Sequence, residues 1–189
     1  SANAGANGAS GMLVFSSGTT SKGNSGMVMI GSGAATVGRG GSVAISVGSG
    51  NSGAGGYLSL LAGRSDHVTG GKLVIDGGES SATTSGTVKI RSANAGANGA
   101  SGMLVFSSGT STSGNSGLVM IGSGASTGGR GGSVAVSVGS GNSGAGGYMS
   151  LLAGRSTVVT GGLVAIDGGE GTATTSGSVS IRSANAGAN

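Results

Sequence analysis

The chain has 189 residues, of which 47 are glycine, and it contains no proline, cysteine or tryptophan. Charged residues make up 7% of the chain and aromatic residues 2%, whereas roughly 25% of the residues of typical soluble domains are charged. The net charge is +4. This composition argues against most enzymes, against cysteine-based metal sites and against an ordinary globular core with a polar shell.

A long internal repeat organises the sequence. Ser1–Thr19 recurs unchanged as Ser92–Thr110, and the first seven residues return as Ser183–Asn189. We interpret residues 1–189 as one continuous domain with a 91-residue repeat, namely 1–91, 92–182 and a partial copy over 183–189. Since the chain starts and stops at the same place in the pattern, we expect it to be a segment of a longer repetitive chain.

A finer repeat lies inside each of these long units. Pairs of apolar residues in alternation recur at steps of 15, with one step of 16 between Val88 and Leu104. The pairs are Leu13/Phe15, Val28/Ile30, Val43/Ile45, Leu58/Leu60, Leu73/Ile75, Val88/Ile90, Leu104/Phe106, Val119/Ile121, Val134/Val136, Met149/Leu151, Val164/Ile166 and Val179/Ile181. A glycine stands two residues before the first member of each pair, as Gly11 does before Leu13.

The alternation predicts a short β-strand with one buried face in each of these short repeats, and the glycines permit tight corners. A single short strand cannot bury its face, but stacked repeats can pair in parallel and form internal apolar ladders. The sequence therefore predicts an all-β fold: a β-solenoid (parallel β-helix) of about twelve coils with ~15 residues each and a flattened, narrow cross-section.

Stacking at this period would bring opposite charges together on adjacent coils. We expect four cross-coil ion pairs, each joining residues one short repeat apart. They are Arg64–Glu79, Asp76–Arg91, Arg155–Glu170 and Asp167–Arg182. We interpret them as solvated contacts between coils.

Apolar side chains also occupy positions that the alternation places on the outer face. These candidates for lateral contact are Met12, Val14, Met27, Met29, Tyr57 and Leu61 in the first unit, and Met103, Val105, Leu118, Met120, Tyr148 and Leu152 in the second. A soluble monomer has little reason to expose such a stripe. We favour contact with another copy of the rod, and the alternative is that a loop or a broader coil covers the stripe within the chain.

No catalytic, cofactor or metal site is predicted. His67, the only histidine, lies beside Asp66, but the second unit has Val158 and Thr157 at these two places. The carboxylates are too few and too scattered for a calcium loop, and no P-loop motif occurs. The chain lacks the basic run with interleaved aromatic residues that would favour nucleic-acid binding, and it has no apolar stretch long enough for a membrane span.

Blocks such as SSGTTSKGNSG at 16–26 and GSGNSGAGG at 48–56 resemble the hyper-repetitive Gly/Ser/Thr-rich β-solenoid proteins on the surfaces and in the secretions of microalgae such as diatoms. They resemble bacterial solenoid adhesins more distantly. The resemblance implies a location outside the cell or on its surface and a fibrous or adhesive role, with no catalytic residue.

We therefore expect a structural component of an extracellular fibre or filament that assembles by coil stacking and lateral apolar contacts. Its partners would be other copies of itself, end to end and side by side, with surface glycans as further partners. The alternative is an ice-binding, surface-binding or glycan-binding solenoid module. The flat threonine array of ice binders is missing, because the second-wall positions are Thr20, Ala35, Gly50, Ser65, Ser80 and Ala95.

Overall fold

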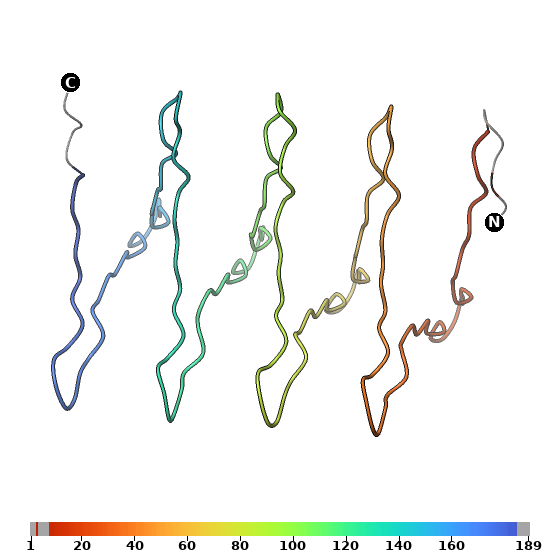
Figure 1. Cartoon of the computed structure of the whole chain (residues 1–189), viewed down its shortest axis with the longest axis horizontal. Coiled ribbons are helices and arrows are strands. Elements are labelled where there is room, and N and C mark those ends of the chain that lie inside the picture. Colours follow the sequence, from red (N-terminus) through yellow and green to blue (C-terminus); the bar gives the residue numbers. More distant parts are fainter. Residues whose placement is uncertain (1–2, 4–7, 185–189) are drawn as a thin grey trace. The chain divides into compact units, whose positions relative to one another are not determined.

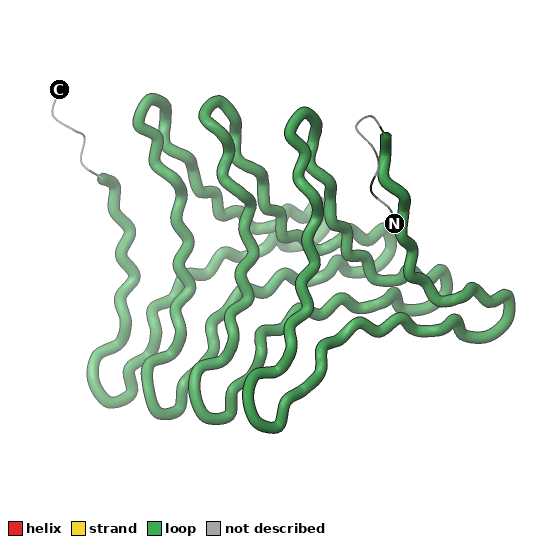
Figure 2. Tube along the Cα trace, turned by 45° about the vertical axis from the view of Figure 1, so that its right-hand side comes forward, coloured by secondary structure: helices red, strands yellow, loops and turns green. Residues whose placement is uncertain are grey.

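A computed structural model of the chain describes residue 3 and residues 8–184 and divides into two compact units, Ser1–Ile90 and Arg91–Asn189. The backbone of the described residues forms neither an α-helix nor a β-strand. Each unit is a series of extended segments and narrow loops (Figures 1 and 2). The predicted all-β fold, the β-solenoid with about twelve stacked coils, is therefore wrong. Most of the partial third copy over 183–189 lies outside the described residues.

The narrow loops are here called arms, and in most of them two glycines eight residues apart close the base. In the arm 33–41, the Gly41 N–H donates a hydrogen bond to the Gly33 carbonyl at 3.1 Å. Equivalent bonds join Gly71 to Gly63 and Gly86 to Gly78 in the first unit, and Gly132 to Gly124, Gly147 to Gly139, Gly162 to Gly154 and Gly177 to Gly169 in the second. These bonds close within the span of one short repeat, whereas a solenoid requires bonds between residues one whole repeat apart.

The tips of the arms keep the period that the sequence predicts. The chain bends sharply at 21–23, 36–38, 51–53, 66–68 and 81–83 in the first unit, and at 97–99, 112–114, 127–129, 142–144, 157–159 and 172–174 in the second. The single longer step therefore falls between the arms with tips at 81–83 and 97–99.

Short side chains stabilise these bends locally. The Ser80 Oγ accepts the N–H of Thr83 at 3.0 Å, and the Ser111 Oγ accepts the N–H of Gly114 at 2.9 Å. A serine hydroxyl that bonds to the backbone a few residues ahead is a common device for a turn. At two tips the chain also requires glycine, because Gly23 and Gly38 have φ angles of 108° and 114°.

The apolar residues lie in the segments between the arms, such as 26–33 and 41–48. Because the chain passes through an arm between two such segments, the backbone hydrogen bonds of the described residues join the arm bases and not one apolar segment to the next. Within each unit, successive arms point in different directions, while arms three short repeats apart, such as 33–41 and 78–86, reach the same side (Figure 1). No residue of the described part is buried, so neither unit has an apolar core.

The base of an arm explains why a glycine precedes each apolar pair. A Cβ atom added at Gly86 would lie 2.9 Å from the backbone nitrogen of Gly78, and one at Gly71 would lie 2.9 Å from the nitrogen of Gly63. Both distances are shorter than side chains tolerate, and backbone atoms cannot move away cheaply. A Cβ at Gly78 or Gly63 would meet no atom within 4 Å. In these two arms, lack of space therefore excludes a side chain only at the second glycine.

We predict that Gly86→Ala opens the arm 78–86, because the methyl group and the backbone of Gly78 cannot occupy the same space. Losing a hydrogen bond of about 1 kcal/mol should lower the exchange protection of the residue-86 amide roughly fivefold, measured by NMR on the full chain. Gly78→Ala is the matched control and should leave this protection unchanged. Equal effects of the two substitutions would contradict the close approach at the arm base.

Candidate assembly surface

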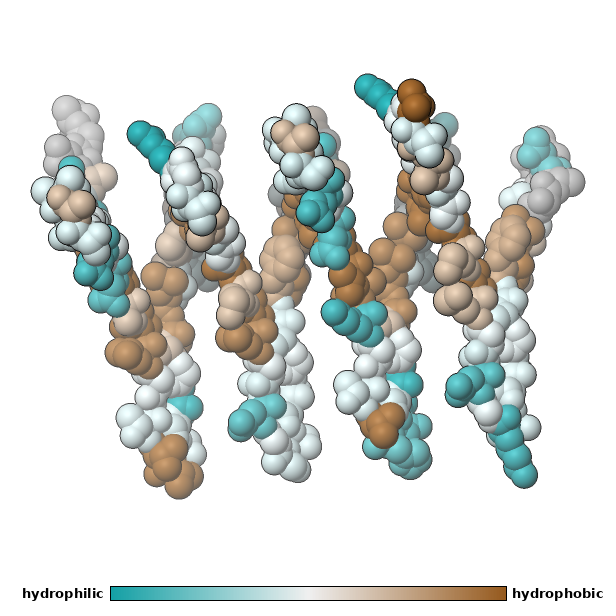
Figure 3. All heavy atoms as spheres, turned by 90° about the horizontal axis from the view of Figure 1, so that it is seen from below, coloured by the Kyte–Doolittle hydropathy of each residue, from teal (hydrophilic) through white to brown (hydrophobic). Residues whose placement is uncertain are grey.

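All the apolar segments are open to solvent. The first residue of each alternating pair is exposed by between 46% (Val88) and 67% (Leu13), although the alternation predicts it to be internal. The twelve candidates for lateral contact are exposed by between 63% (Val14 and Val105) and 92% (Leu152). The two sides of a segment do not differ consistently, since Val74 on the outer side is exposed by 53% and Leu73 and Ile75 on the inner side by 56% and 59%. Neither side is enclosed. Figure 3 shows apolar side chains at the surface on the face in view.

The solvent-accessible area of the chain is much larger than that of a folded monomer of the same mass. It is 18583 Å² for a mass of 17.1 kDa. A folded monomer of this mass exposes about 7,800 Å², and the extended chain exposes about 25,000 Å². The arms therefore remove only roughly a quarter of the extended-chain area from water, against the roughly 70% that a folded domain of this size removes.

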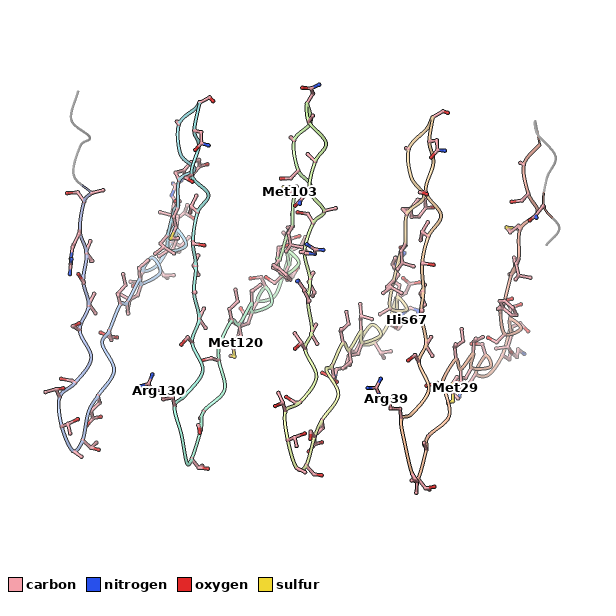
Figure 4. The ribbon with its side chains drawn as sticks, in the orientation of Figure 1. Met29, Arg39, His67, Met103, Met120 and Arg130 are labelled. Atoms are coloured by element: carbon pink, nitrogen blue, oxygen red, sulfur yellow. The ribbon has the colours of Figure 1, made fainter. Side chains whose placement is uncertain are left out.

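Apolar side chains of two successive repeats meet in one place. Phe15 from the first repeat and Val28, Met29 and Ile30 from the second line an open hollow of about 390 Å³. Its lining is mostly apolar, so it offers van der Waals contact but few polar groups that could orient a small ligand. Met29 and its counterpart Met120 are labelled in Figure 4. This hollow can receive an apolar side chain from outside the unit.

The charged residues are arranged differently from the predicted ladder. In the part of the chain that the structure describes, the ion pair is between Arg64 and Asp66, two residues apart on one arm. Because successive repeats do not stack, Arg64 does not lie within ion-pair distance of Glu79. The same holds for the other pairs expected between repeats, Asp76–Arg91, Arg155–Glu170 and Asp167–Arg182. Arg182 donates instead to the Ser180 hydroxyl at 3.0 Å.

No group of residues for catalysis is assembled in the described ranges. Three or more histidine, aspartate or glutamate side chains do not gather there in a way that could hold a metal ion. His67 lies at an arm tip, where its backbone N–H contacts the Ser65 hydroxyl at 3.4 Å. Over the same ranges, no helix has the length and apolar character needed to cross a membrane.

The hydrogen bond between two glycines that closes most of the arms was not predicted from the sequence. Its signal was present, since a glycine after one apolar pair and a glycine before the next stand eight residues apart, as Gly63 and Gly71 do. From the sequence, glycines are assigned to the tight corners of a coil, whereas in the structure the Gly71 N–H donates a hydrogen bond to the Gly63 carbonyl. Comparison with protein-family models, curated proteins and solved structures gave no match.

We predict that serine at Met27, Met29, Leu118 and Met120 weakens association between copies, because these side chains bury apolar area only against a partner. Each buried side chain contributes about 1.5–3 kcal/mol, so the concentration needed for association should rise at least roughly 100-fold, measured by sedimentation.

The control for that experiment replaces Val37 and Val158 by serine. Both valines lie at arm tips and are exposed by 95% and 89%, outside the apolar segments. The control should associate as the wild type does. An equal effect in both variants would show that general loss of hydrophobicity, and not the apolar segments, governs association.

Proposed function

We propose that this protein is a structural component of an extracellular fibre or filament and that it acquires its apolar core by associating with other copies of itself. The observation that carries the proposal is the exposure of all the apolar segments, which recur at the same short period through both units. A sequence that maintains such a pattern without burying it inside one chain has the properties of an assembly surface.

The area still exposed indicates an extended assembly instead of a simple dimer. The chain would have to lose roughly 10,000 Å² of accessible area to reach the value typical of a folded protein of its mass. A standard interface removes only about 800 Å² from each partner. Contacts along the whole length of the chain, with several neighbours, are needed to supply the difference.

The internal repeat supports propagation of these contacts. Both units present the same apolar segments, displaced along the sequence by one 91-residue repeat, so a contact that suits one unit also suits the other. Identical surfaces displaced along a chain allow head-to-tail contacts, which generate filaments when the rotation between neighbours does not close a ring. The same repetition supports both end-to-end and side-by-side association.

The sequence resemblance to surface and secreted proteins of microalgae supports a place outside the cell or on its surface. Serine and threonine are abundant on the arms, and every arm is accessible in the described residues. These hydroxyl groups can hydrogen-bond to the sugars of surface glycans, which supports an adhesive role for the assembled material.

We expect purified chains to form fibres above a threshold concentration, visible by electron microscopy and measured as a sedimenting fraction. Association supplies the burial that one chain lacks, so the fraction should rise steeply with concentration. Chains that remain monomeric at every concentration would contradict the proposal. Thermal hysteresis of freezing by those monomers would then favour the alternative, an ice-binding module.

A further inference from the structure

Four of the five carboxylates cluster at the base of two equivalent arms. Asp76 and Glu79 flank the first residue of the arm 78–86, and Asp167 and Glu170 flank that of the arm 169–177. The fifth carboxylate, that of Asp66, forms an ion pair with Arg64. Within the described residues none of the four clustered carboxylates takes part in an ion pair. We call 78–86 and 169–177 the acidic arms.

An arginine directly follows the tip of the arms that lie three short repeats earlier in the chain. Arg39 lies in the arm 33–41 and Arg130 in the arm 124–132, each two residues before the closing glycine. Neither arm contains a carboxylate. We call 33–41 and 124–132 the basic arms, and Figure 4 labels both arginines at corresponding places in the two units.

Each unit carries one basic arm and one acidic arm on the same side. In the first unit the arms 33–41 and 78–86 reach the same side, and within the second unit, taken by itself, the arms 124–132 and 169–177 share a side (Figure 1). The apolar pattern repeats at steps of 15 or 16. Sliding one chain along another by three such steps therefore restores the apolar register and exchanges basic arms for acidic ones.

We propose, as a development of the proposed self-assembly, that a second copy of this chain lies alongside the first with a stagger of three short repeats, half of one 91-residue unit. This stagger sets the basic arms of one copy against the acidic arms of the next. Parallel copies that are aligned without a stagger, or displaced by one whole unit, would place the acidic arms of one copy against the acidic arms of the next. Apolar contact supplies most of the affinity, and the charges select among otherwise equivalent registers.

The test compares a chain whose two basic arms are made acidic with one whose two acidic arms are made basic. The first carries R39E and R130E, and the second carries D76K, E79K, D167K and E170K. Each should require a roughly tenfold higher concentration to sediment at low salt, because attraction at each arm becomes repulsion. An equimolar mixture should recover the wild-type threshold, and about 0.5 M salt should remove the difference.

A third variant with K22E and R155E has the same net charge as the first, but its changes lie on other arms, and it should assemble as the wild type does. Variants that assemble normally alone, or a mixture that shows no recovery, would overturn the staggered register and leave the proposed function intact. A wild-type chain that stays monomeric would overturn both, since another kind of partner would then have to cover the apolar segments.

Discussion

The hydrogen bond between two glycines eight residues apart is the constraint on which the rest of this structure depends. It closes a narrow arm within the span of one short repeat, as between Gly78 and Gly86, where the bond is 2.7 Å long. A chain that folds back on itself at this spacing does not present one repeat to the next. The apolar segments between the arms are therefore left exposed, and the described residues form no buried core.

The periodicity could be predicted from the sequence, but the pairing could not. The bends recur at the predicted steps, including the one longer step, and the glycine before each apolar pair has a steric reason at Gly71 and Gly86. Alternation at Val43 and Ile45 is compatible with a strand, yet it does not say which backbone will pair with that strand. Short-range closure between glycines costs less chain entropy than pairing across a whole repeat.

The candidate assembly surface was predicted only in part. Alternation predicts an inner and an outer side for each segment, but the exposures overlap: Met29 on the outer side is exposed by 79%, and Val28 and Ile30 on the inner side by 52% and 74%. It did not predict that the side assigned to the interior also remains accessible to solvent. An alternating apolar pattern does not say whether the surface that covers it belongs to the same chain or to another. The cross-coil ion pairs failed to form for a related reason, since they require neighbouring repeats to stack.

Assembly would account for both the exposed apolar segments and the placement of the charged arms. The apolar segments need a neighbour to be removed from water, and the basic and acidic arms give that neighbour a preferred position. The side chains of the arms are mostly small, and the absence of a side chain at Gly71 and Gly86 lets the backbone approach closely at the arm base. The composition that argues against an enzyme is therefore well suited to a repetitive structural material.

The rate of methionine oxidation tests the central claim most directly, namely that apolar burial comes from association and not from folding of one chain. The methionines are Met12, Met27, Met29, Met103, Met120 and Met149, and all are exposed by 49% or more. In dilute hydrogen peroxide, mass spectrometry of peptides should show all six reacting at nearly the rate of free methionine below the association threshold, and several-fold more slowly above it. Strong protection that is independent of concentration would contradict the account, because it would show that a single chain encloses these side chains by itself.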